Sequence, residues 1–438
     1  MEKMNRAIKL FKEKNIFSVI IGIVVFIVFL TFLFCITIGG GDGVTSDLNE
    51  SKMAQENTTS QKTTTEVITT TEPTTTEIIT TTEPETTTVQ AETTTPKPTM
   101  PYVEVNGDYS HIGYITPTDG VVTMAFVGDI NLSEKIENYY NNSGLDGFLS
   151  KNLQNIFLNS DIFGINHEYV SSDAGDEHKV DYEIWYYKNP TRRQYILNEM
   201  GVDVVTLANN HTMDYGVEGL IDTMNSLKAR NIAYVGVGNN LEEAKSAYIQ
   251  EVNGKKIAIL AANRVVPRVD WYAYENKPGQ MTTYESTDRF GMIKEEITRL
   301  KTIEKCDVVV VMVHFGENKQ PIVQDYQKYV ARGYVDAGAD IIVGCHTHTL
   351  QGAEIYNDKY IFYGVSNFLF ENYLIDSAVV QASLDENNKL TVKLVPCVSQ
   401  NYQTHDVCGN EAKRIFKEIE ALSTNIVIDD DGVVKLKN

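Results

Sequence analysis

Four short apolar runs in this chain each end in side chains that can bind a metal ion, and this pattern constrains the fold more than any other feature. The runs and the residues that follow them are 121–127 with Gly128-Asp129, 202–208 with Asn209-Asn210-His211, 308–313 with His314-Phe315-Gly316-Glu317, and 339–343 with Gly344-Cys345-His346-Thr347-His348. Such runs predict buried β-strands. Because α/β proteins build their sites at the carboxyl ends of parallel strands, we expect these polar groups to form one shared site.

Short apolar runs alternate with amphipathic segments from residue 121 onward, which indicates an α/β fold. The predicted strands are 121–127, 202–208, 233–237, 256–261, 307–313, 341–344 and 360–363. The predicted helices are 191–200, 217–230, 288–301, 324–337 and 410–423. Residues 378–395 alternate like an antiparallel pair, with a turn at Glu386-Asn387-Asn388.

Residues 16–38 form an uncharged stretch that as a helix would rise about 34 Å, enough to cross a hydrocarbon core of about 30 Å. Basic residues outnumber acidic ones in residues 1–15, so the positive-inside rule predicts a cytoplasmic tip. We therefore expect a single-pass protein of the cell membrane whose remaining chain is extracellular. A cleaved signal peptide is the alternative, but the stretch is longer than a usual signal and Gly39-Gly40-Gly41-Asp42 is a poor cleavage site.

Thr, Glu and Pro dominate residues 39–101, where Ile68-Thr69-Thr70-Thr71-Glu72-Pro73 recurs at residues 79–84. This composition cannot bury a core and predicts a disordered linker. The linker would serve as a stalk that carries the domain away from the membrane, or only as a generic spacer. Residues 102–438 then form the extracytoplasmic domain, with a motif core at 121–370.

The formal net charge is −21. This charge argues against a nucleic acid partner, because binding nucleic acid relies on Lys and Arg to neutralise phosphates. An anionic substrate would need local neutralisation, which bound metal ions can supply. Of the exported cysteines, Cys397 and Cys408 could pair across a short loop or remain free thiols.

His346 and His348 are the sharpest of the site signals. Side chains two apart on an extended segment point the same way, so both imidazoles can reach neighbouring metal ions. By the same alternation Cys345 should face the core. Glu168 could bridge two cations, which need a shared anion between them. Asp129 is a further candidate ligand, although an Asp after a Gly is also a common turn former.

The polar residues around these ligands each allow two interpretations. Asn210 could bind metal through its amide oxygen, and His211 is then placed to donate a proton. Asp214 could orient His211 or cap the following helix. Glu317 could orient His314 or remain a loop charge.

Three residues are expected to contact substrate, namely Asn209, Glu317 and Asn367. Asn367 follows another predicted strand and could instead cap a turn. Asn131, two residues after Asp129, could add an amide oxygen to the site or serve as a cap.

Seven segments, in chain order, carry a resemblance to a known family. They are Phe126-Val127-Gly128-Asp129-Ile130, Asn166-His167-Glu168, residues 207–216, Val237-Gly238-Asn239-Asn240, His314-Phe315-Gly316-Glu317, residues 346–351 and Gly364-Val365-Ser366-Asn367-Phe368. They resemble the capsule-synthesis protein CapA family, which is implicated in poly-γ-glutamate biosynthesis or export and is similar to calcineurin-like metallophosphatases. The resemblance covers about residues 121–370.

The resemblance implies a four-layer α/β/β/α metallophosphatase-like sandwich with two divalent metal ions, such as Mn, Fe or Zn, at one edge. Asp129 and His348 would hold one ion, Glu168 would bridge, and His211 would act as general acid. The ligands of the other ion would be Asn210, His314 and His346. The phosphatases have a histidine where this chain has Asn131, so the resemblance implies that the ion at Asp129 is weakly held or absent.

Three functions follow from these observations. The first is an anchored metal-dependent hydrolase or transferase that acts on an envelope phosphoester or a poly-γ-glutamate chain, alongside other capsule or polyglutamate synthesis subunits. The second is a non-catalytic assembly or polymer-binding subunit of a synthesis complex, which the substitution at Asn131 favours and the retention of His211 disfavours. The third, an adhesin on a stalk, explains the linker but not the strand ends.

Overall fold

The computed structural model describes residues 120–181, 186–370 and 373–437. The predicted cytoplasmic tip, membrane helix and Thr-rich linker lie outside these residues. None of the helices formed by the described residues has the length and apolar character that a membrane crossing requires.

The larger of the two main sheets in the described residues has eight strands. Its order is β18-β17-β16-β1-β2-β5-β6, and β15 pairs with β1 beyond the end of β16. The strands are β1 (Val122–Ile130), β2 (Ile162–His167), β5 (Val204–Thr206), β6 (Ala233–Val235), β15 (Asn367–Leu369), β16 (Ile375–Leu384), β17 (Leu390–Gln400) and β18 (Gln403–Asp406). The strands β1, β2, β5 and β6 run parallel, so their carboxyl ends meet at one edge.

The second main sheet has six strands within the described residues, in the order β13-β14-β12-β11-β9-β8. They are β8 (Tyr248–Val252), β9 (Lys255–Asn263), β11 (Val308–His314), β12 (Ile341–Cys345), β13 (Ala353–Tyr356) and β14 (Lys359–Phe362). The central strands β9, β11, β12 and β14 are parallel, and the two edge strands are antiparallel to their neighbours. The described residues also form three separate two-stranded sheets. They pair β3 (Val170–Ser171) with β4 (Lys188–Asn189), β7 (Val237–Gly238) with β10 (Gly279–Gln280), and β19 (Ile426–Ile428) with β20 (Val434–Leu436).

The two sheets face each other across one apolar core, because alternate residues of each strand point to opposite faces. In β11, Val308, Val310 and Met312 enter the core between the sheets. Their neighbours Val309 and Val311 instead pack under the helices on the outer face. The strand is therefore apolar throughout, as expected of a parallel strand covered on both sides.

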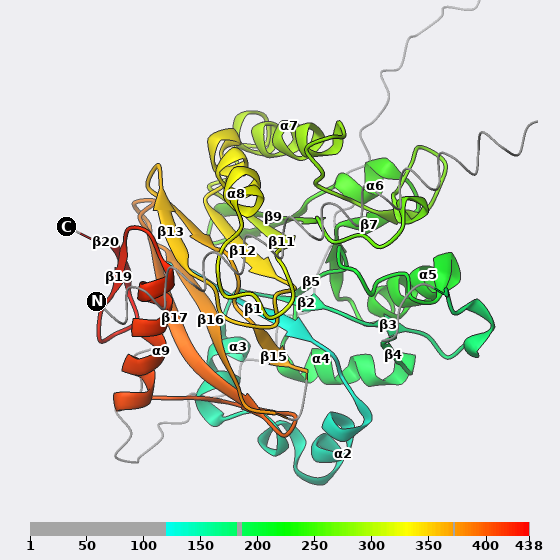
Figure 1. Cartoon of the computed structure of the whole chain (residues 1–438), viewed down its shortest axis with the longest axis horizontal. Helices are drawn as coiled ribbons and strands as arrows, with labels where there is room; N and C mark the ends of the chain where they lie inside the picture. Colours follow the sequence, from blue (N-terminus) through cyan, green and yellow to red (C-terminus); the bar gives the residue numbers. More distant parts are fainter. Residues whose placement is uncertain (1–119, 182–185, 371–372, 438) are drawn as a thin grey trace, which may run out of the picture. The chain divides into compact units, whose positions relative to one another are not determined.

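Helices cover the outer faces of both sheets (Figure 1). The eight-stranded sheet is covered by α2 (Glu134–Ser143), α3 (Lys151–Asn159), α4 (Tyr195–Met200) and α5 (Gly216–Lys228), and the six-stranded sheet by α6 (Leu241–Lys245), α7 (Arg289–Thr302) and α8 (Asp325–Ala337). Helix α9 (Gly409–Leu422) instead packs its apolar face against the core between the sheets.

Local sequence sets the ends of α8, the helix that leads into β12. Gln324 and Gln327 form a reciprocal capping box at its start. Gly338 ends it with a φ of 118°, a left-handed conformation that favours glycine. The stop at Gly338 lets the chain enter β12 at Ile341, and β12 then carries the chain to the histidine pair.

The predicted α/β class is confirmed, and each strand and helix predicted after residue 120 has a counterpart among the described residues. The antiparallel pair is also confirmed as β16 and β17. The predicted helix at 191–200 begins as a 3-10 turn, Thr191–Gln194, before α4. Cys397 and Cys408 are both free thiols, and Cys345 is buried in the core between the sheets, as its alternation predicted.

Candidate metal centre

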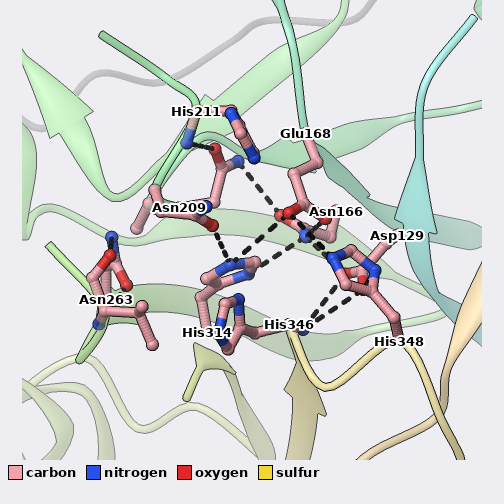
Figure 2. A network of polar contacts seen from close by, with 12 residues as sticks. Asp129, Asn166, Glu168, Asn209, His211, Asn263, His314, His346 and His348 are labelled. Carbon is pink, nitrogen blue, oxygen red and sulfur yellow. Dashed lines mark hydrogen bonds and ion pairs between the residues drawn. The ribbon is translucent and has the colours of Figure 1, made fainter. Parts of the chain in front are cut away.

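The structure brings the polar residues from several strand ends to one place (Figure 2). Asp129 lies in β1, and Glu168 directly follows β2. His314 is the last residue of β11, and His346 and His348 follow β12. The site therefore lies where the carboxyl ends of parallel strands from both sheets meet, which is the arrangement expected from the sequence.

Asp129 occupies a strand rather than a turn after one. The Gly-Asp pattern is common in turns, but β1 continues through Gly128 and Asp129 to Ile130. A Cβ atom on Gly128 would lie 2.0 Å from the carbonyl oxygen of Ser366. The glycine is therefore required by the close approach of a neighbouring segment, and this approach lets the Asp129 N–H donate to that carbonyl at 3.2 Å.

The expectation that His346 and His348 lie on an extended segment is wrong. The strand ends at Cys345, and the two histidines have φ angles of 93° and 51°. These angles lie in the left-handed region, which non-glycine residues rarely adopt and which costs about 1–3 kcal/mol per residue. Both imidazoles reach the site because the backbone turns after the strand, and not because of strand periodicity.

Two groups of possible metal ligands overlap at one carboxylate. Glu168, His314 and His346 offer ligand atoms within 4.8 Å of one another, and so do Asp129, Glu168 and His348. The Glu168 Oε1 atom lies 3.7 Å from His314 Nε2 and 3.8 Å from His348 Nε2. A carboxylate shared in this way is what two neighbouring cations need between them.

The chemistry of these donors fits divalent cations. His346 Nδ1 is buried and has no hydrogen-bond partner among the described residues. Such an orphaned nitrogen is costly unless a ligand occupies its lone pair. His348 Nδ1 lies 2.5 Å from the amide oxygen of Asn367, so Nδ1 carries the proton and Nε2 offers its lone pair toward Glu168.

Burial and neighbouring charges hold the donors in their metal-binding protonation states. Burial, and then the proximity of His348, lowers the pKa of His346 to about 3. Burial also lowers the pKa of His314 well below its usual value. Burial by itself would raise the pKa of Asp129, but His348 and Asn166 outweigh it and keep that pKa below its usual value. At neutral pH the imidazoles of His314 and His346 are therefore neutral, and the Asp129 carboxylate is ionised.

Asn166, to which the sequence pattern assigned no role, holds the centre together. Its Nδ2 donates to Asp129 Oδ1 at 2.7 Å and lies 3.4 Å from Glu168 Oε2. The same nitrogen is 3.2 Å from His314 Nδ1. Asn166 is the penultimate residue of β2, and the rule applied to the other strand ends would have identified it had residues 162–167 been predicted as a strand.

Asn210 and His211 follow β5 on the cavity side of the ligands. Asn210 Oδ1 lies 2.7 Å from His314 Nε2, and His314 belongs to the ligand group that includes Glu168 and His346. His211 Nδ1 lies 2.9 Å from Asp214 Oδ2, so Asp214 orients the imidazole. Asp214 Oδ2 also accepts from the Tyr187 N–H at 2.9 Å, which fixes the carboxylate in turn.

A cavity of about 460 Å³ opens beside the ligands. Its walls include Asn210, His211, His346 and His348. Arg264, which the sequence pattern did not single out, also lines it. A small group bound there would therefore contact both the ligand side chains and a cationic one.

The residues predicted to contact substrate lie elsewhere than the cavity wall. Asn209 is fully buried, where its side chain donates to Asn166 and to the His167 carbonyl. Asn367 is buried against His348. Glu317 is exposed and is not among the residues that line the cavity.

The side-chain oxygen of Asn131 makes a hydrogen bond outside both ligand groups. Its Oδ1 accepts from Asn189 Nδ2 at 2.7 Å, and Asn189 in turn accepts from Arg193 at 2.7 Å. The amide is therefore used in a buried hydrogen-bond network.

Several known proteins are similar to this chain in sequence. Residues 123–372 match the family described as bacterial capsule synthesis protein PGA_cap. The PGA biosynthesis protein CapA of Bacillus subtilis (strain 168) is 34% identical over 285 residues, which cover 64% of this chain and 72% of that protein. The capsule biosynthesis protein CapA of Bacillus anthracis is 32% identical over 306 residues, which cover 68% and 72%. A 5'-nucleotidase of Bos taurus is 26% identical over 183 residues, which cover 40% of this chain and 29% of that protein.

Proposed function

This chain belongs to the bacterial capsule synthesis protein family, and we propose that it is a metal-dependent hydrolase that acts in the biosynthesis or export of a capsule polymer of the poly-γ-glutamate type. The observation that carries this proposal is the sharing of Glu168 between two groups of metal ligands, with His211 beside them. Two facing sheets covered by helices, and a relative named 5'-nucleotidase, support a metallophosphatase-like fold and a phosphoester or related substrate.

The residues divide the chemistry between binding and proton transfer. Asp129, His348 and Glu168 would hold one cation. The ligands of a second cation would be Glu168, His314, His346 and Asn210. When bound, a pair of divalent cations supplies an activated water and stabilises developing negative charge.

His211 then serves as general acid. Asp214 holds its Nδ1 proton, so Nε2 is the atom that exchanges a proton with the leaving group. A subunit that only assembled other proteins would not need the His211 imidazole at a cavity wall, oriented by the buried Asp214 carboxylate. The hydrolase is therefore preferred over the assembly role.

The setting proposed for this activity is the outer face of the cell membrane. Residues 16–38 would form the anchor and residues 39–101 a spacer, so the catalytic domain would meet the polymer outside the cell. Other subunits of the polymer synthesis machinery would be its partners.

The test uses the full chain, purified in detergent, stripped of metal with a chelator and reloaded with Mn²⁺, Fe²⁺ or Zn²⁺. Phosphoester hydrolysis is followed with p-nitrophenyl phosphate and its diester, and cleavage of a γ-linked glutamate oligomer by chromatography. We expect metal-dependent turnover that falls at least about a hundredfold in His211→Gln with unchanged metal content. The exposed His405→Gln is the matched control.

Polymer output gives a second measurement. Strains that lack their own copy would be complemented with the wild type, His211→Gln or His405→Gln. Absence of turnover on every substrate together with full polymer output from His211→Gln would overturn the hydrolase proposal in favour of an assembly role.

A further inference from the structure

Arg264 follows the carboxyl end of β9, the strand that pairs with β11 on the side opposite β12. Asn263 is paired with His314 in this register, and the Arg264 N–H donates to the His314 carbonyl at 2.8 Å. The side chain of Arg264 lines the cavity that His211, His346 and His348 also line. We propose that Arg264 binds an oxyanion of the substrate, a carboxylate or a phosphate, and this proposal rests on the proposed function of the same site.

Two tyrosines hold the guanidinium in place. Its central carbon lies 4.0 Å from the ring centroid of Tyr284 and 5.0 Å from that of Tyr326. Each ring is fixed through its hydroxyl, because Tyr284 accepts from the Val266 N–H at 3.1 Å and Tyr326 from the Gly316 N–H at 2.8 Å. Stacking on fixed rings reduces the entropy that the guanidinium would lose on binding an anion.

An ion pair with Glu285 sets the direction of the guanidinium. Nε and Nη2 both lie 3.0 Å from Glu285 Oε2. The contacts with Glu285 involve Nε and Nη2 and not Nη1, so the edge formed by Nη1 and Nη2 can still meet a planar oxyanion. Glu285 therefore orients the fork and occupies only one of its sides.

The other cavity walls fit the same ligand. Among the described residues that line the cavity, Arg264 is the one with a permanent positive charge, and no Asp or Glu lines it. In a chain of net charge −21, a cavity wall without Asp or Glu spares an anionic substrate direct repulsion by a lining carboxylate. Val265, Val266 and Pro267 line the wall beside Arg264 and suit a short aliphatic arm next to the anionic group.

The test measures anion binding by calorimetry on the metal-loaded full chain. The probes are inorganic phosphate and a γ-linked glutamate oligomer, which separate a phosphate ligand from a carboxylate ligand. Arg264→Gln should weaken binding of at least one probe about tenfold or more, because a charge-assisted hydrogen-bond pair is lost. Arg264→Lys, which keeps the charge but loses the planar fork, should weaken the same probe by a smaller factor.

Arg268→Gln is the matched control. Arg268 lies in the same loop, is paired with Asp270, and does not line the cavity. Metal content should be unchanged in all three variants. Wild-type affinity of Arg264→Gln for both probes, or an equal loss in Arg268→Gln, would overturn the inference.

The two proposals can fail separately. Anion binding that depends on Arg264 without any hydrolysis would contradict the proposed function and support the subsite. Metal-dependent hydrolysis with unchanged anion affinity in Arg264→Gln would support the proposed function and contradict the anion subsite at Arg264.

Discussion

The backbone N–H of His346 donates to the carboxylate of Asp129, at 3.3 Å from Oδ1 and 3.2 Å from Oδ2. This contact joins the end of β12 in one sheet to the end of β1 in the other. It stabilises the left-handed conformation of His346 and orients both oxygens of a fully buried carboxylate. The two sheets are thus tied together at the point where the ligand groups meet.

Replacing Glu168 should affect both ligand groups at once, because it is the residue they share. We expect Glu168→Gln to lower the affinity for divalent cations by more than about a hundredfold, since the amide cannot supply a bridging anion. Elemental analysis after dialysis against Mn²⁺ or Zn²⁺ measures this loss. Glu251→Gln, an exposed change on β8, should bind metal like the wild type, and unchanged metal content in Glu168→Gln would contradict the shared site.

Removing Asn166 tests its role as a positioning residue. Asn166→Ala should lower metal affinity by about tenfold to a hundredfold, because Asp129 and Glu168 lose the donor that orients them. It should also destabilise the fold by about 1–3 kcal/mol, because Asn209 loses its acceptor. Metal titration and urea unfolding measure the two effects. Asn159→Ala, which removes a contact within one helix, is the control.

Asp214 should act on catalysis through His211. Asp214→Asn should lower kcat by about tenfold to a hundredfold with little change in KM or metal content, since the imidazole loses its orienting carboxylate. The pH profile of kcat should also change, which a purely structural defect would not produce. Asp430→Asn, at an exposed surface ion pair, is the comparison. Loss of metal from Asp214→Asn would argue against this division of roles.

Two glycine substitutions compare a tightly packed glycine with a glycine that has open space around it. Gly128→Ala should destabilise the protein by about 1–3 kcal/mol or more, because the new Cβ would meet the Ser366 carbonyl. Gly291→Ala, in α7 with open space around it, should instead be neutral or stabilise by up to about 1 kcal/mol. Urea unfolding of both variants measures the contrast, and equal stabilities would contradict it.

Buried His167 should make the fold sensitive to acid. Burial lowers the pKa of His167 from 6.5 to about 4, so the unfolded chain takes up a proton that the folded chain does not until lower pH. The contribution of His167 to stability is therefore full above pH 6.5 and is lost as the pH falls from 6.5 to about 4. The loss amounts to about 3 kcal/mol, taking about 1.4 kcal/mol for each pKa unit.

The measurement is urea unfolding of the full chain between pH 4 and pH 7.5, with chelator present. His167→Gln should show a shallower fall in stability than the wild type over this range. His405→Gln, on the exposed side of β18, should follow the wild-type curve. Identical slopes for all three would exclude His167 as a cause of the acid sensitivity.

Some predictions from the sequence failed where a side chain's direction depended on a turn. His346 and His348 were expected to share a face of an extended segment, yet the backbone leaves the strand at Cys345. Asn367 was expected to contact substrate, and it instead holds His348. Turns of this kind are set by neighbouring segments, so no local period encodes them.

Two further site residues lie at strand ends, although the sequence pattern assigned them no role. Asn166 and Arg264 sit at the ends of β2 and β9 just as His314 sits at the end of β11. The position of Arg264 near a strand end follows from the sequence, since residues 256–261 are predicted as a strand. The pairing of Arg264 with Tyr284 and Tyr326 could not, because it joins separate loops.

The amino-acid sequence by itself determined the α/β class, the positions of several strands along the chain and the presence of His, Asn and acidic residues at strand ends. Hydrophobic periodicity and strand-end chemistry are local properties, so the sequence encodes them directly. Only the tertiary structure decided that Glu168 serves two ligand groups, that His346 binds Asp129 through its backbone, and that a cavity with one cationic wall opens beside them. Those features depend on residues more than a hundred positions apart, and packing two sheets face to face is what brings such residues within contact distance.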